Sequence, residues 1–176
     1  MSVTSFILDI LKFSITGFIV FTASWLVIKK FITETYGAKQ TALQREVLQQ
    51  TLPLKLQAYE RIVIFLDRIN PSNLLIRLHV SGISAKELQQ IILTEVRTEY
   101  QHNIAQQLYV SNVSWQVVKR LKDDTLSMIN NAANGLSEGA SGIELSRTIL
   151  SHLTTLETNP YEQGASIIIS EINRIF

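Results

Sequence analysis

The stretch FSITGFIVFTASWLVIKK, residues Phe13–Lys30, decides the architecture of the chain. It has no charged residue until two lysines end it, and no polar stripe runs through it. Its 16 uncharged residues, Phe13–Ile28, would span about 24 Å as an α-helix, slightly short of a hydrocarbon core of roughly 30 Å. Apolar residues before Phe13 supply the difference, so we expect a spanning helix over about Phe6–Ile28.

Two other interpretations of this stretch fit less well. A cleaved signal peptide would have small residues at its cleavage site, whereas residues 25–28 (WLVI) run directly into Lys29 and Lys30. The helix of a soluble core would keep one polar stripe, and residues 13–28 have none. We therefore predict a transmembrane anchor.

Lysine and arginine are unevenly distributed around the predicted span. Only Lys12 precedes its uncharged part, whereas Lys29, Lys30, Lys39 and Arg45 follow it. Positively charged flanks tend to stay in the cytoplasm. We therefore predict a single-pass protein of the bacterial inner membrane, with its N-terminus outside and its C-terminal domain in the cytoplasm. The absence of cysteine is compatible with either side.

Small side chains recur along one side of the span. Ser14, Gly17, Phe21 and Ser24 follow one another at steps of three or four residues, so they share a helical face. In lipid, small side chains let two helices approach closely. We predict that this seam packs against a second copy of the chain or another membrane protein. The alternative is that small residues are simply common in spanning helices.

The remainder of the chain predicts an all-α domain. Glycine and proline are sparse, at 7 and 3 of 176 residues, and apolar residues recur at helical spacing. After an anchor over residues 1–30 we expect a helical stalk over residues 31–52, with a narrow apolar face that includes Ala42 and Leu43. Short connections then favour a compact helical bundle of about five or six helices over residues 53–176.

Proline, glycine and asparagine mark several expected helix ends. Pro53 is expected to kink or restart the first helix. Asn70 and Pro71 are expected to end it and to begin a short helix, because proline suits the first helical position. Gly135 is available for a left-handed cap at the end of a later helix.

Two capping boxes mark the starts of two other helices. A box pairs a serine with a glutamate three residues later, as in Ser84 with Glu87 and Ser141 with Glu144. From the first box we expect one long helix that reaches Leu108. The expected core faces are Leu56, Tyr59, Ile62, Val63, Leu66 and Ile69; Leu88, Ile91, Ile92, Val96, Tyr100, Ile104 and Leu108; Trp115, Val118, Leu121, Met128 and Ala132; and Ile149, Leu150, Leu153 and Leu156.

Charge separates along the chain, although the whole is nearly neutral. Residues 29–122 contain 13 Lys or Arg against 7 Asp or Glu, and residues 123–176 contain 2 against 7. A basic membrane-proximal half suits a domain close to an anionic inner leaflet. The alternative is that these charges only solvate helix surfaces.

Three arginines are candidates for contact with a partner or a lipid. Arg61, Arg68 and Arg77 follow one another at seven and nine residues, and a guanidinium binds phosphate or carboxylate through two parallel hydrogen bonds. They could therefore contact lipid phosphate or an acidic partner, as could Lys29 and Lys30. Alternatively Glu60 and Asp67, which share the seven-residue spacing, pair with the arginines within the chain.

Two fragments of catalytic motifs lack the context that such motifs need. GLSEG, Gly135–Gly139, matches the nucleophile elbow of hydrolases, with Ser137 as the nucleophile and His152 downstream, but the elbow needs a strand before it. Residues 95–102 offer Glu95, Glu99 and His102, which form only half of a di-iron pattern. We therefore predict neither catalytic nor metal-binding residues, and no cofactor.

We also predict that neither nucleic acid nor nucleotides are partners of the chain. The basic cluster Lys119, Arg120 and Lys122 is followed at once by Asp123 and Asp124, whereas nucleic-acid binding needs a sustained basic face. No glycine-rich phosphate loop is present, and no small-molecule substrate is evident.

The run LPLKLQAYERIVIFLDRINPSNLLIRL, Leu52–Leu78, follows the anchor and resembles a family of short bacterial single-pass membrane proteins of unknown function. The resemblance implies the architecture of anchor and helical domain, and it implies no activity. We expect a non-catalytic, membrane-anchored adaptor or accessory subunit that acts through protein contacts. The alternatives are a membrane-surface enzyme, either a hydrolase or a metalloprotein, and a module that senses anionic lipid.

Overall fold

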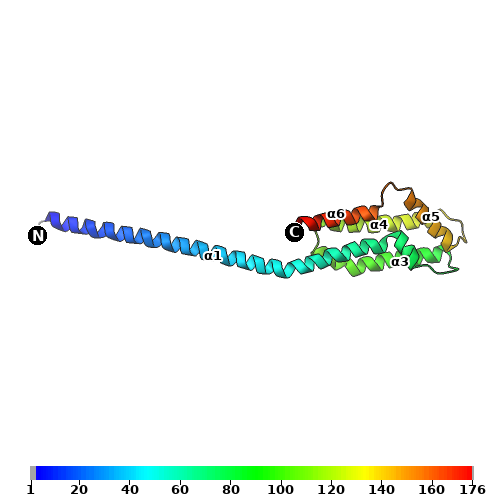
Figure 1. Ribbon diagram of the computed structural model, residues 1–176, viewed down its shortest axis with the longest axis horizontal. Helices are drawn as coiled ribbons and strands as arrows, with labels where there is room; N and C mark the ends of the chain where they lie inside the picture. The colour runs from blue at the N-terminus through cyan, green and yellow to red at the C-terminus, as the bar shows by residue number, and fades with distance from the viewer. Residues whose placement is uncertain (1–2, 176) are drawn as a thin grey trace. The chain divides into compact units, whose positions relative to one another are not determined.

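A computed structural model describes residues 3–175, except the side chains of residues 3–6, 9, 34–44 and 175. This part of the chain is helical and contains no strand, which confirms the predicted all-α fold. The chain divides into two compact units, Met1–Thr51 and Leu52–Phe176. The long helix α1 (Val3–Ile69) contributes to both units (Figure 1). The predicted apolar face at Ala42 and Leu43 lies outside the described side chains.

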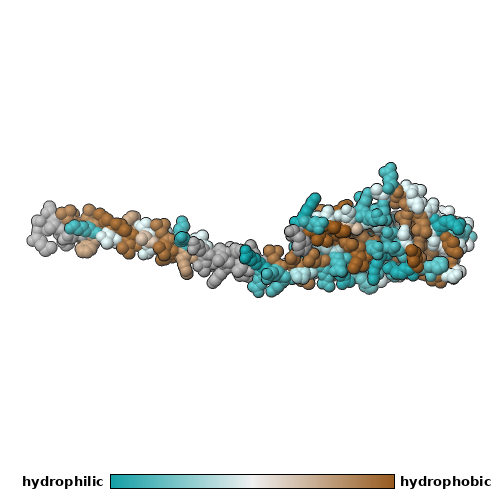
Figure 2. All heavy atoms as spheres, in the orientation of Figure 1, coloured by the Kyte–Doolittle hydropathy of each residue, from teal (hydrophilic) through white to brown (hydrophobic). Residues whose placement is uncertain are grey.

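The first unit consists of α1 alone. From Ile10 to Thr33 this helix is long and apolar enough to cross a membrane, and the rest of the described chain buries none of it. Figure 2 shows apolar side chains along most of this stretch. At 24 residues it is about 36 Å long, which exceeds a hydrocarbon core of roughly 30 Å. The stretch begins and ends a few residues later than the predicted Phe6–Ile28.

Threonine hydroxyls in the apolar stretch are satisfied by the helix itself. Each donates a hydrogen bond to the carbonyl oxygen four residues earlier: Thr16 to Lys12 at 2.8 Å, Thr22 to Phe18 at 2.7 Å and Thr33 to Lys29 at 2.8 Å. An unsatisfied polar group costs several kcal/mol in hydrocarbon, on the order of 4 or more. These bonds make the three threonines compatible with a lipid environment.

The helix restart that was one of the two outcomes expected at Pro53 does not occur, because α1 continues through this residue to Ile69. Proline lacks the N–H that would bond the carbonyl of Gln49, so one backbone hydrogen bond is lost. The flanking leucine, glutamine and lysine residues favour helix strongly enough to continue on both sides. In the preceding turn the Thr51 hydroxyl donates to the carbonyl of Val47 at 2.8 Å.

The second unit is a helical bundle. Helix α3 packs against α4 and α5, and α4 also packs against α5 and α6 (Figure 1). The elements that follow α1 are α2 (Pro71–Arg77), α3 (Ala85–Asn103), the 3₁₀ helix η1 (Ile104–Leu108), α4 (Asn112–Asn134), α5 (Gly142–Thr154) and α6 (Pro160–Ile175). Asn70 caps α2 and Pro71 occupies its first turn, as predicted.

The last turns of α1 supply much of the bundle's core. Ile62, Phe65 and Ile69 are fully buried. The ring of Phe65 meets the ring of Tyr100 edge-on at 6.2 Å between centroids, and Tyr100 stacks on Trp115 at 5.7 Å. An aromatic row therefore joins α1, α3 and α4.

The long helix expected to reach Leu108 ends earlier, at Asn103. The Asn103 side chain donates to the carbonyl of Glu99 at 2.9 Å, and such bonds to the backbone compete with regular helix geometry. The chain then tightens into η1, and Ile104 and Leu108 are exposed, Leu108 by 76%. The predicted core positions of these two residues are therefore wrong, as are those of Leu56, Ile91, Leu150 and Leu156, which are 38% to 40% exposed.

Helices α3 and α5 begin with the same pattern, Gly-x-Ser-x-x-Glu-Leu, at residues 82–88 and 139–145. Both predicted capping boxes are present. Gly82 and Gly139 have φ of 76° and 91°, a left-handed conformation that favours glycine. The left-handed cap expected at Gly135 is wrong, since its φ is −81°.

These two helix starts are joined by backbone hydrogen bonds. Ser84 and Ser141 form an antiparallel bridge, in which the N–H of Ala85 donates to Ala140 at 2.9 Å and that of Gly142 to Ile83 at 2.8 Å. A Cβ atom at Gly142 would lie 3.1 Å from the carbonyl oxygen of Ile83, so this close approach favours glycine. The repeated pattern thus ties α3 to α5.

The capping boxes make the bundle sensitive to acid. Hydrogen bonds from the Ser84 side chain and backbone lower the pKa of Glu87, and those from the Ser141 backbone and side chain lower the pKa of Glu144. A lowered native pKa contributes stability above the unfolded value of about 4.3, and this stability is lost as the pH falls through the native value.

We therefore expect the unfolding midpoint of the bundle to fall with pH below about 4.3, and to fall less in the double variant Glu87→Gln/Glu144→Gln. Urea unfolding at a series of pH values measures this dependence. Glu157→Gln, at an exposed position, is the control and should leave the dependence unchanged. If the double variant and the wild type lose stability equally with falling pH, Glu87 and Glu144 are not the source of the acid sensitivity.

Candidate functional site

A cleft between α1 and α3 brings together several of the polar residues singled out from the sequence. Its volume is about 210 Å³. The residues from α1 are spaced by three and four, and the two later residues from α3 lie three and four positions after Glu99, so each set lies on one side of its helix. The lining residues are Arg61, Ile64 and Arg68 from α1, and Glu99, His102 and Asn103 from α3.

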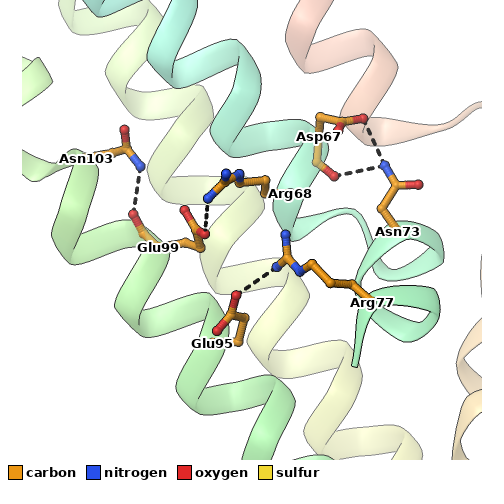
Figure 3. A network of polar contacts seen from close by, with 7 residues as sticks. All are labelled: Asp67, Arg68, Asn73, Arg77, Glu95, Glu99 and Asn103. Atoms are coloured by element: carbon orange, nitrogen blue, oxygen red, sulfur yellow. Dashed lines mark hydrogen bonds and ion pairs between the residues drawn. The ribbon is translucent and has the colours of Figure 1, made fainter. Parts of the chain in front are cut away.

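Two of the three predicted arginines form ion pairs with α3 (Figure 3). Arg68 lies 2.6 Å from Glu99, and Arg77 lies 2.9 Å from Glu95. Neither of the two predicted carboxylate partners, Glu60 and Asp67, forms an ion pair with an arginine among the described side chains. Asp67 instead accepts a hydrogen bond from Asn73 at 2.9 Å. The arginine partners therefore come from a different helix.

Glu99 is the buried member of this network. Its side chain is 9% exposed, whereas that of Arg68 is 51% exposed. A buried carboxylate needs a cation and hydrogen-bond donors, and Arg68 supplies both. The sequence carried a signal for this pair, because Glu99 continues the buried stripe of Leu88, Ile92 and Val96 along α3.

Arg61 differs from the other two arginines. Within the part of the chain whose side chains are described, no carboxylate forms an ion pair with it. Its side chain lines the cleft together with the exposed His102. Of the three predicted arginines, Arg68 and Arg77 are therefore paired with carboxylates, and Arg61 has no described ion pair.

The predicted seam of the first unit is accessible along its length. Ser14, Gly17, Phe21 and Ser24 are all exposed, and a Cβ atom at Gly17 would meet nothing within 4 Å. Lys29 and Lys30 lie near the end of the same apolar stretch. The described part of the chain therefore leaves this face open to lipid or to another helix.

Neither catalytic fragment acquires the neighbours that its chemistry needs. Ser137 lies in the exposed connection between α4 and α5, which follows a helix and not the strand of a nucleophile elbow. Glu95 and Glu99 are bound to arginines, and no group of three or more metal-ligating side chains occurs among the described residues.

In the predicted basic cluster, Lys122 lies 4.6 Å from the centre of the Tyr100 ring and 2.7 Å from Asp123.

These features define an all-α chain with one apolar N-terminal helix and a helical bundle. Residues 5–175 match the model of a family of unknown function, DUF7935, and the chain belongs to this family. The match confirms the predicted resemblance to a family without assigned activity, and it extends over both units. No curated protein and no solved structure matches the chain.

Proposed function

We propose that this protein is a non-catalytic adaptor or accessory subunit, anchored in a membrane by α1 and binding partner proteins. The observation that carries the proposal is the apolar stretch Ile10–Thr33, none of which is buried by the described chain. Exposure of an apolar surface of this size to water is unfavourable, and the hydrocarbon core of a bilayer can bury a helix of this length. The internally bonded threonine hydroxyls support the same environment.

The proposed location is the bacterial inner membrane, in single-pass orientation with the bundle in the cytoplasm. Support comes from the lysines and arginine that follow the uncharged part of the span, since such residues favour the cytoplasmic side. The basic excess in residues 29–122 would then lie on the side of the anionic leaflet.

Protein contact is the activity that the described residues support best. The seam of small residues is exposed, and the carboxylates and serine considered for catalysis are either bound to arginines or placed in a helix connection. In the proposal, Ser14, Gly17, Phe21 and Ser24 pack against a second copy of the chain or another membrane protein. No nucleic acid and no small-molecule substrate takes part.

Substitution Gly17→Leu is expected to weaken this assembly by about tenfold, equivalent to ~1.4 kcal/mol. Leucine would hold two helix backbones apart, yet the open space at Gly17 means that it disturbs no contact within the described chain. Native gels and chemical crosslinking of the full chain in membranes measure the assembled fraction.

Ala23→Leu is the matched control, because Ala23 is another small residue of the same stretch and lies on the opposite face of the helix from the seam. It should leave the assembled fraction unchanged. If Gly17→Leu and wild type assemble equally, the seam does not pack against a partner.

A further inference from the structure

The cleft formed by Arg61, Ile64, Arg68, Glu99, His102 and Asn103, here called the Arg61 cleft, has an excess of hydrogen-bond donors. Its one carboxylate, Glu99, already binds Arg68 at 2.6 Å. The Arg61 guanidinium has five N–H donors and no acceptor, and an imidazole offers a further N–H. The ligand that complements such a lining is an anion.

Charge leads to the same conclusion. The Arg68–Glu99 pair is neutral as a unit, so Arg61 leaves the cleft with one uncompensated positive charge. Arg68 donates one described hydrogen bond, from Nη1, and its half-exposed side chain has other guanidinium N–H groups that can donate to a ligand. Two guanidinium groups and one imidazole thus line the same hollow.

Size restricts the class of anion. A volume of about 210 Å³ corresponds to roughly seven water molecules at ~30 Å³ each. This accommodates a phosphate group and some of its waters. Arginine pairs of this kind recognise phosphate through several charge-assisted hydrogen bonds.

We infer that the Arg61 cleft binds a phosphate group, held by the guanidinium groups of Arg61 and Arg68 and by the His102 imidazole. The Arg68–Glu99 pair keeps the Arg68 guanidinium in place and prevents the positive charges from repelling one another. The phosphate can be free or part of a lipid headgroup, and the chemistry recognised is the same. This inference goes beyond the adaptor proposal, since a phosphate site is compatible with any location of the chain.

Calorimetric titration of the full chain in phosphatidylcholine nanodiscs tests the site with three probes. They are inorganic phosphate, short-chain phosphatidic acid and short-chain phosphatidylcholine, the last of which presents only a blocked phosphate. We expect Arg61→Gln to weaken phosphate binding by about tenfold or more, as loss of a charged hydrogen bond does. His102→Gln should weaken it less, and Arg61→Lys should restore part of the affinity because it keeps the charge.

Arg97→Gln is the matched control. Arg97 is another exposed arginine of α3, it lies outside the cleft lining, and no described carboxylate forms an ion pair with it. Dependence on Arg61 for both phosphate and phosphatidic acid supports a site for the phosphate group from either source. Dependence for phosphatidic acid alone identifies a lipid headgroup as the ligand. Equal effects of Arg61→Gln and Arg97→Gln, or no binding of either probe, would overturn the inference.

Discussion

Replacing Phe65 with alanine is expected to destabilise the bundle unit by about 3–5 kcal/mol, the usual cost of deleting a fully buried phenylalanine side chain. Phe65 has no exposed surface, and its ring packs edge-on against Tyr100. Tyr100 in turn stacks on Trp115, so the cavity would open beside an aromatic row that joins three helices. Contacts between aromatic rings add about 0.5–1.5 kcal/mol to the loss.

Unfolding of the full chain in detergent, followed by the fluorescence of Trp115, measures this loss. The chain has two tryptophans, so Trp25→Phe in every variant leaves Trp115 as the only reporter. Ile64→Ala is the matched control, since Ile64 precedes Phe65 on the same helix and is 45% exposed. We expect it to cost less than about 1 kcal/mol. A similar small loss for Phe65→Ala would show that α1 does not form part of the bundle core.

Local sequence signals predicted most helix boundaries of the bundle unit. Asn70, Pro71 and the two serine–glutamate boxes act through bonds between residues close in sequence, so their effect does not depend on the tertiary fold. The apolar stripes also follow from helix periodicity, which places residues such as Ile62, Val96 and Ile149 in the core.

The boundaries predicted incorrectly depend on weaker or longer-range effects. Pro53 removes a single hydrogen bond, and the strong helix formers around it outweigh this loss. Asn103 ends α3 through a side-chain bond to Glu99 that competes with the regular ladder. The left-handed glycine is Gly139 and not Gly135, because Gly139 lies in the loop that pairs with the start of α3.

The candidate site was predicted only in part. The spacing of Arg61, Arg68 and Arg77 identifies these arginines, but it points to Glu60 and Asp67 as partners. The partners of Arg68 and Arg77 lie 31 and 18 residues further along the chain, on α3. Periodicity within one helix does not predict which helix faces meet. Glu99 lies in the buried stripe of α3. A buried carboxylate needs a compensating cation, so its position in the sequence already indicates a basic side chain from another helix.

We propose that α1 anchors the chain in a membrane and that the bundle lies in the cytoplasm. Because the chain has no cysteine, single introduced cysteines report their side of the membrane without background. Ser2→Cys precedes the span, and Glu157→Cys occupies an exposed position in the connection between α5 and α6. A membrane-permeant maleimide should label both variants and serves as the control.

Labelling of bacterial spheroplasts with a membrane-impermeant maleimide tests the claim most directly. A charged reagent does not cross the hydrocarbon core. In intact spheroplasts it should therefore label a cysteine outside the membrane and not a cysteine in the cytoplasm. We predict that Ser2→Cys is labelled in intact spheroplasts and that Glu157→Cys is labelled only after lysis. Labelling of Glu157→Cys in intact spheroplasts, or recovery of the protein in the soluble fraction, would contradict the account.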